Sequence, residues 1–190
     1  MAHGLSRALP LLLALLLTGA PVAADTDAAG PVLAPAAAAQ LLADEAYYPA
    51  LLVQISAAQK SIDLVMYLWK ISAALDSKPA ELVHALGEAR RRGVSVRVVL
   101  ENSGYDEELN RANREAAAQL LQEGITTIFD TAAVTTHAKM VVVDQRFCLV
   151  GSHNLTQSAL GRNHEISVML DNPRLAGELT TYVESLLGKR

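Results

Sequence analysis

The chain has 190 residues, of which 51% are apolar, and a formal net charge of −4 at pH 7. This length suffices for one domain with a core and hardly for two, and the acidic balance argues against a broadly basic nucleic-acid-binding surface. The single cysteine, Cys148, excludes an intrachain disulfide.

The first residues predict an export signal. Arg7 supplies positive charge, residues 11–17 are almost wholly apolar, and Val22-Ala23-Ala24 offers a small-residue cleavage site. The apolar run is shorter than the roughly 20 residues that span a bilayer. We therefore expect no stable membrane span and an exported protein, periplasmic or secreted. The predicted order is a signal peptide over residues 1–24, a flexible leader over 25–37 and the catalytic domain over 38–190.

The spacing of apolar residues then predicts alternating helices and strands. The first part of the domain contains predicted helices over 38–46, 49–60, 79–92 and 107–123, and predicted strands over 62–69, 94–100 and 126–129. The second part contains predicted strands over 139–143, 147–150 and 166–170, a short helix before the last of these, and a closing helix from Pro173. The predicted class is α/β, with a mixed β-sheet sandwiched by helices.

A set of polar residues falls on and beside the later strands. His137, Lys139 and Asp144 form the pattern H-x-K-x4-D, followed by Gly151-Ser152-x-Asn154 and by Asn163-x-Glu165. Alternate residues of a strand share a face, so His137 and Lys139 point the same way, as do Ser152 and Asn154. These two pairs predict a phosphate-sized polar pocket.

Two other members of this pattern have predicted structural roles. Gly151 permits a close approach of backbone at the pocket. Asp144 lies an odd number of residues from both His137 and Lys139, so we expect it to face away from the pocket and to begin the turn between two strands.

Together these segments resemble the HKD signature of the phospholipase D superfamily, in particular its small, single-motif bacterial members. The resemblance extends over roughly residues 49–171 and includes the segment 57–67 and the helix end Arg92-Gly93-Val94. It implies a phospholipase D-like fold. The superfamily includes phospholipases, small secreted endonucleases and phosphatidyl-transferring synthases.

The resemblance also implies a role for each site residue. His137 attacks phosphorus to form a phosphohistidine, Lys139 and Asn154 contact the phosphoryl oxygens, and Ser152 assists through its hydroxyl. Glu165 orients the imidazole, which fixes its tautomer and raises its nucleophilicity. Gly151 and Asn163 complete the structural part of the motif together with Asp144.

This mechanism needs no cofactor and no metal ion. His153 and His164 stand at irregular intervals from His137, and His153 is expected to face away from Ser152 and Asn154, so the sequence does not predict a metal site.

One motif supplies only one histidine, whereas the reaction needs a second group to protonate the leaving oxygen and later to activate water. A twofold homodimer with a shared active site would bring together His137 from each subunit.

Three functions remain open from the sequence: a phospholipase D that hydrolyses phospholipid to phosphatidic acid, a sequence-nonspecific endonuclease acting on DNA or RNA, and a non-catalytic phosphate-binding module. The acidic charge favours phospholipid over nucleic acid, because affinity for a polyanion comes from many basic contacts. A lipid substrate also requires exposed apolar surface near the pocket, for which Leu68, Trp69 and Ile71 are the candidates.

Overall fold

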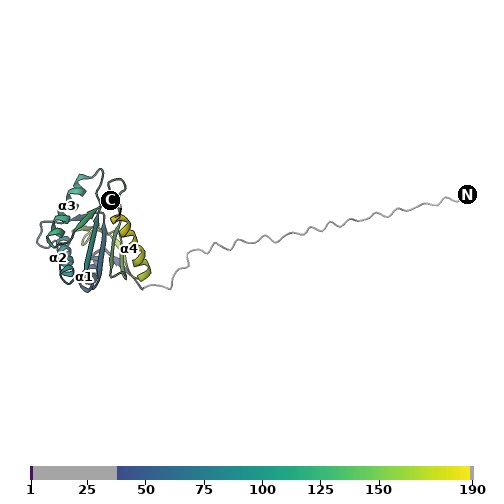
Figure 1. The fold of residues 1–190 in the computed structure, drawn as a ribbon, viewed down its shortest axis with the longest axis horizontal. Coiled ribbons are helices and arrows are strands. Elements are labelled where there is room, and N and C mark those ends of the chain that lie inside the picture. The colour runs from purple at the N-terminus through teal and green to yellow at the C-terminus, as the bar shows by residue number, and fades with distance from the viewer. Residues whose placement is uncertain (2–37, 189–190) are drawn as a thin grey trace. The chain divides into compact units, whose positions relative to one another are not determined.

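The computed structural model describes Met1 and residues 38–188 (Figure 1). Apart from Met1, the predicted signal peptide and leader lie outside the described residues. Seven strands form one sheet in the order β1-β9-β7-β6-β2-β4-β5, and β3 pairs with β8 in a separate two-stranded sheet. The strands are β1 (Ala38–Ala43), β2 (Ser61–Met66), β3 (Trp69–Lys70), β4 (Ser95–Leu100), β5 (Thr127–Phe129), β6 (Lys139–Val143), β7 (Phe147–Gly151), β8 (Leu155–Thr156) and β9 (Ile166–Asp171).

The large sheet contains both parallel and antiparallel strand pairs, because its two halves are connected in different ways. Helical crossovers join β2, β4 and β5, which pair in parallel. The pairs from β2 through β6, β7 and β9 to β1 are antiparallel. The carboxyl ends of β2 and β7 therefore lie beside the first residues of β6 and β9, at one end of these strands.

Helices cover both faces of the sheet. Figure 1 shows α1, α2 and α3 on one side and α4 on the other. Their bounds are α1 (Tyr47–Ala57), α2 (Lys78–Arg91), α3 (Glu107–Gln122) and α4 (Pro173–Leu187). The predicted α/β class, a mixed sheet sandwiched by helices, is confirmed. None of the helices in the described part of the chain has the length and apolar character needed to cross a bilayer.

Local sequence signals set the helix boundaries. Ser77, Asp106 and Asn172 precede α2, α3 and α4, and each side chain accepts a hydrogen bond from a backbone N–H of the first turn. Gly93 follows α2 with a φ of 95°, and Gly124 follows α3 with a φ of 75°. These left-handed conformations suit glycine, which has no β-carbon to clash.

The predicted helix over residues 38–46 is wrong. This segment is strand β1 followed by the 3-10 turn η1 (Asp44–Ala46), and β1 pairs with β9 from Ala38 opposite Asp171 to Ala43 opposite Ile166. Alanine favours a helix by only a few tenths of a kcal/mol per residue. The backbone hydrogen bonds offered by the edge of β9 outweigh that preference.

The predicted short helix before β9 is also wrong. Strand β8 occupies residues 155–156, and the chain then runs through a series of turns to residue 162. Thr156 Oγ1 accepts a hydrogen bond from the Ala159 N–H at 3.1 Å, and the Ser158 carbonyl accepts from the Asn163 N–H, five residues later, at 2.9 Å. Such local bonds compete with regular helix geometry.

Helix α4 covers only part of its face of the sheet. It packs on Val142, Cys148 and Leu170. On the same face, nearer the strand ends where β6 and β9 begin, the register places three residues side by side. They are Leu41 on β1, Val168 on β9 and Val150 on β7. Leu41, Val150 and Ile166 are exposed there, so the described residues leave an apolar strip of sheet uncovered.

Candidate active site

The predicted site residues lie together at the end of the strands where β2 and β7 finish and β6 and β9 begin. Five of them surround a hollow of about 470 Å³, together with Gly151 and Ile166. The five are His137, Lys139, Ser152, Asn154 and Glu165. The structure thus gathers residues that lie up to 28 positions apart in the sequence.

Lys139 is the innermost of these groups, with 7% of its surface exposed. Its Nζ donates a hydrogen bond to the His137 carbonyl at 2.8 Å and lies 3.1 Å from Nδ1 and 3.3 Å from Nε2 of the same residue. Burial lowers the pKa of the Lys139 ammonium below its ordinary value, and the Glu165 carboxylate opposes that shift. A cationic donor is therefore held directly beside the imidazole.

Tyr67, the first residue after β2, forms a wall behind this pair. Its ring centroid lies 4.4 Å from that of His137, and the Lys139 ammonium lies 4.7 Å from the Tyr67 centroid. The contact combines ring packing with a cation–π interaction. Only the pairing of β2 with β6 brings Tyr67 to His137, so the sequence alone did not reveal this contact.

Glu165 is held by hydrogen bonds from two sides. Ser152 Oγ donates to Glu165 Oε2, and Asn163 Nδ2 donates to Oε1 at 3.1 Å. Ser152 Oγ also accepts from the Ile166 N–H at 3.0 Å. The described residues contain no hydrogen bond between Glu165 and His137, so the predicted orienting role of Glu165 stays a prediction.

Gly151, the last residue of β7, and Asn154, in the segment between β7 and β8, line another side of the hollow. Asn154 Oδ1 is buried and has no hydrogen-bond partner among the described residues. This oxygen can only accept a hydrogen bond, so a contact with a phosphoryl oxygen would have to come from Nδ2. A β-carbon on Gly151 would overlap Ser167 and the Ile166 carbonyl of β9. Only glycine allows β9 to lie this close to the pocket.

Asp144 lies away from the hollow, at the turn between β6 and β7. Its carboxylate accepts hydrogen bonds from the backbone N–H groups of Gln59, Lys60 and Ser61 at 2.7–3.2 Å. Asp144 and Gln145 form the tight turn, with φ angles of 55° and 53°. The geometry assigns Asp144 to the turn and to the start of β2.

His153 and His164, the two histidines considered above as metal ligands, lie beside the segment that precedes β9. His153 is fully buried, stacks on Tyr47 at 4.3 Å, and contacts Ser167 Oγ at 2.7 Å and the Asp44 carbonyl at 2.8 Å. His164 is exposed and contacts Asp44 Oδ2 at 3.2 Å. The described residues contain no cluster of three or more potential metal ligands.

Comparison with known families decides the assignment. The family model described as "Cardiolipin synthase, PLD-like domain" matches residues 51–187, which is more than half of the chain. The chain belongs to the phospholipase D superfamily. Members of this superfamily are phosphodiesterases.

Curated relatives of this phospholipase D-like chain include cardiolipin synthase A of Proteus mirabilis, 32% identical over 53% of the chain, and cardiolipin synthase A of Citrobacter koseri, 29% identical over 57%. The matched segments are 20% and 22% of those proteins, so the chain corresponds to about a fifth of their length.

Solved structures show the same fold. Nuc of Salmonella typhimurium, a phospholipase D family member, superposes with a TM-score of 0.68 and 24% identity, covering 81% of this chain and 96% of that one. NucT of Helicobacter pylori superposes with a TM-score of 0.62 and 16% identity, covering 79% and 95%. At these identities the likeness concerns the fold alone.

The phospholipase D-like site also includes a buried anchor that the sequence did not reveal. Glu101 Oε2 accepts a hydrogen bond from the Thr136 N–H at 2.5 Å, and Thr136 Oγ1 donates to Asp130 Oδ2. Glu101 is 1% exposed and Asp130 7%. These carboxylates fix the residue immediately before His137, and because they follow β4 and β5, only the sheet order brings them there.

Proposed function

We propose that this chain is a phospholipase D-type phosphodiesterase that hydrolyses phospholipid through a phosphohistidine on His137. The observation that carries the proposal is the single hollow that His137, Lys139, Ser152, Asn154 and Glu165 share. It brings a nucleophile, a fixed cation, two neutral hydrogen-bonding side chains and a carboxylate to one hollow. These are the groups that displacement at phosphorus requires.

The reaction has two steps at one phosphorus atom. An imidazole nitrogen of His137 attacks phosphorus, the bond from phosphorus to the head-group oxygen breaks, and a proton donor converts that oxygen to an alcohol. Water then attacks the phosphohistidine, the P–N bond breaks, and phosphatidic acid leaves. Lys139 and Asn154 stabilise the charge on the phosphoryl oxygens in both steps.

The proton donor is the group that one subunit does not supply. We propose that His137 of a second subunit performs this role in a twofold homodimer. The uncovered apolar strip formed by Leu41, Val150 and Ile166 supports this arrangement, because Ile166 also lines the catalytic hollow. A partner seated on the strip would bury apolar surface and bring the two hollows close to the twofold axis.

Apolar loop residues around the site favour a lipid substrate over a nucleic acid. Trp69, one of the apolar candidates from the sequence, is fully buried. Instead, Leu75, Tyr105 and Val134 are exposed on the loops that follow β3, β4 and β5. Exposed aliphatic and tyrosine side chains of this kind suit the boundary between lipid and water.

We also propose that the protein is exported, on the strength of the charged, apolar and small-residue segments of residues 1–24. An exported enzyme of this kind would meet phospholipid from outside the cytoplasm.

The decisive experiment compares two substrates under identical conditions. Signal-free protein is assayed on phosphatidylcholine vesicles and on plasmid DNA in the presence of EDTA, with His137→Ala as the control. We expect choline release that disappears in the variant, because no other described residue of the hollow can form the phosphohistidine. DNA nicking that disappears in His137→Ala would instead establish the nuclease, and turnover unaffected by this substitution would contradict the assigned nucleophile.

A further inference from the structure

The residue that follows β1 alters the regular pairing of this strand with β9. The last regular pair joins Ala43 to Ile166, so the next pair in the same register would be Asp44 and Glu165. In a hydrogen-bonded antiparallel pair, each residue donates its N–H to the carbonyl of the other. Asp44 supplies one of these two bonds in the regular way, because its N–H donates to the Glu165 carbonyl at 2.8 Å.

The second bond of this pair is made by the Asp44 side chain. The Glu165 N–H donates to Asp44 Oδ1 at 2.9 Å, so the carboxylate takes the place that a backbone carbonyl has in a regular pair. The Asp44 backbone has a φ of 52°, which aspartate and asparagine adopt more readily than most other residues with a β-carbon. The Asp44 carbonyl instead accepts a hydrogen bond from His153 Nε2 at 2.8 Å.

His153 connects Asp44 to another side of the catalytic hollow. It stands between Ser152 and Asn154 in the sequence, and both of these line the hollow together with Glu165. The His153 side chain is fully buried, so its place in the fold is fixed by packing. Asp44 therefore joins the two segments whose side chains form the hydrogen bond between Ser152 and Glu165.

Glu165 depends on these contacts because it lies outside regular secondary structure. The chain from residue 157 to residue 165 contains neither helix nor strand, and β9 begins only at Ile166. Ser152 and Asn163 bind the Glu165 carboxylate, whereas Asp44 binds its backbone on both the N–H and the carbonyl. Without Asp44, the backbone of Glu165 would lose the bonds that fix it to β1.

We infer that Asp44 is a positioning residue, which holds Glu165 in place at the catalytic hollow through its side-chain bond to the Glu165 N–H. The part that Glu165 plays in turnover rests on the proposed function, whereas its placement beside Lys139 does not. The pKa of the Asp44 carboxyl lies below its ordinary value, first because of the Glu165 N–H and second because of His164. His164 is fully exposed, and an exposed ion pair contributes little.

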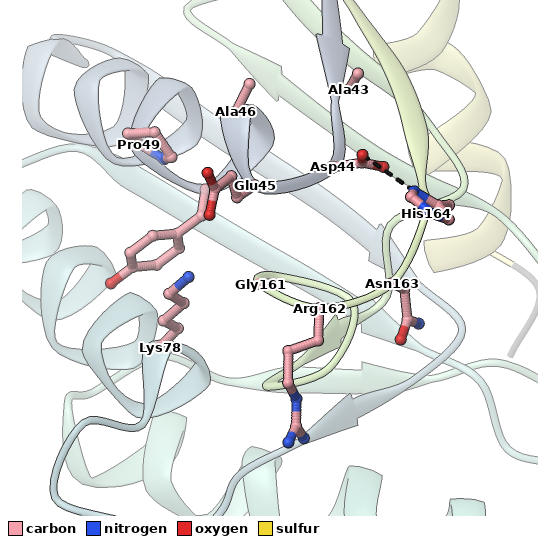
Figure 2. Close-up of a pocket in the computed structure, with 11 residues that line it drawn as sticks. Ala43, Asp44, Glu45, Ala46, Pro49, Lys78, Gly161, Arg162, Asn163 and His164 are labelled. Atoms are coloured by element: carbon pink, nitrogen blue, oxygen red, sulfur yellow. Dashed lines mark hydrogen bonds and ion pairs between the residues drawn. The ribbon is translucent and has the colours of Figure 1, made fainter.

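Three substitutions separate the side-chain bond from the backbone conformation. Asp44→Asn keeps an oxygen that accepts from the Glu165 N–H, and it tolerates the positive φ. Asp44→Gly keeps only the backbone conformation, and Asp44→Ala keeps neither. Glu45→Gln is the matched control, because Glu45 is exposed and its side chain has no hydrogen bond within residues 38–188. Figure 2 shows Asp44 beside His164, with Glu45 turned away from both.

Turnover is measured first, as choline release from phosphatidylcholine vesicles, with thermal unfolding as the check on folding. We expect Asp44→Gly and Asp44→Ala to lower kcat about tenfold, because small displacements of a group in the site are costly. Asp44→Asn should retain most of the activity, and Glu45→Gln and His164→Gln should match the wild type. Equal activity in Asp44→Gly and Asp44→Asn would overturn the role of the side chain.

The second measurement reports the position of Glu165 without catalysis. Burial lowers the pKa of the Lys139 ammonium, and the Glu165 carboxylate opposes that shift. A carboxylate that moves away should therefore lower this pKa further. NMR titration of protein labelled with carbon-13 at the lysine ε-carbons measures it, with the Lys139 signal assigned from Lys139→Arg. We expect a lower pKa in Asp44→Gly than in the wild type. Asp44→Asn removes the same charge, keeps the bond, and should leave the Lys139 pKa unchanged.

Glu165→Gln shows whether Asp44 acts through Glu165. In this background the Lys139 pKa should be the same with aspartate or glycine at position 44. A Lys139 pKa that Asp44→Gly leaves at the wild-type value would overturn the inference. So would a further fall when Asp44→Gly is added to Glu165→Gln. A wild type that released no choline and nicked no DNA would contradict the proposed function, while the lysine titration would still decide the role of Asp44.

Discussion

At the scale of single residues, the charge of the Asp144 carboxylate makes the stability of the fold depend on pH. Burial by itself raises the pKa of its carboxyl, but the backbone N–H groups of Ser61, Gln59 and Lys60 outweigh burial and hold the pKa below its ordinary value. The unfolded chain therefore binds this proton more readily than the folded chain does. The stabilisation is complete above the unfolded pKa, near 4, and is lost as the pH falls through the folded pKa.

Asp144→Asn should lower the free energy of unfolding at pH 7 by about 1–2 kcal/mol, because a neutral amide accepts these hydrogen bonds more weakly. Urea unfolding at neutral and acidic pH measures the effect, with the exposed Asp76→Asn as the control. We expect the gap between wild type and Asp144→Asn to narrow in acid. A gap that stays constant with pH would show that the charge is not its source.

At the scale of elements, the segment between β5 and β6 carries the nucleophile. Thr136 is the point at which this segment is fixed, through its N–H to Glu101 and its hydroxyl to Asp130. We expect Thr136→Val to lower kcat about tenfold or more, since small displacements of a reacting group are costly. Thr136→Ser, which retains the hydroxyl, should restore most of the activity.

Steady-state kinetics of both variants on one substrate provide the test, with thermal unfolding as the check on folding. Because Thr136 lies outside the substrate-binding hollow, KM should change little. If both variants lost activity in proportion to their fall in melting temperature, the loss would reflect unfolding. That result would contradict a positioning role for Thr136.

The same segment shows what the sequence could and could not predict. His137, Lys139, Ser152 and Asn154 were predicted from the H-x-K-x4-D and Gly-Ser-x-Asn segments, which resemble the HKD signature. The two-residue repeat of a strand supported the prediction that each pair shares a face. Tyr67, Glu101 and Asp130 follow β2, β4 and β5, and only the pairing of β6 with β2, β2 with β4 and β4 with β5 brings them to His137. Strand β1 was missed because its pairing with β9 outweighs local helix preference.

At the scale of the whole molecule, each chain contains one motif and one such histidine, whereas the proposed reaction needs two. In the proposed homodimer, both copies of His137 serve one reaction, so replacing either one should abolish turnover at the shared site. With equal amounts of wild type and His137→Ala and free subunit exchange, only about a quarter of the dimers contain two copies of His137. We expect the activity per wild-type chain to fall to about half.

Charged substitutions in the uncovered strip provide the matched control for this mixing experiment. His137→Ala combined with Leu41→Lys and Val150→Lys should not inhibit, because a lysine buried against the partner is strongly unfavourable. His137→Ala combined with Val53→Lys, at an exposed apolar position on α1, should still inhibit. Sedimentation velocity of each protein measures its assembly directly. Wild-type activity that is unaffected by excess His137→Ala, in mixtures where exchange is demonstrated, would mean that each subunit works alone and that the second proton donor lies within the chain.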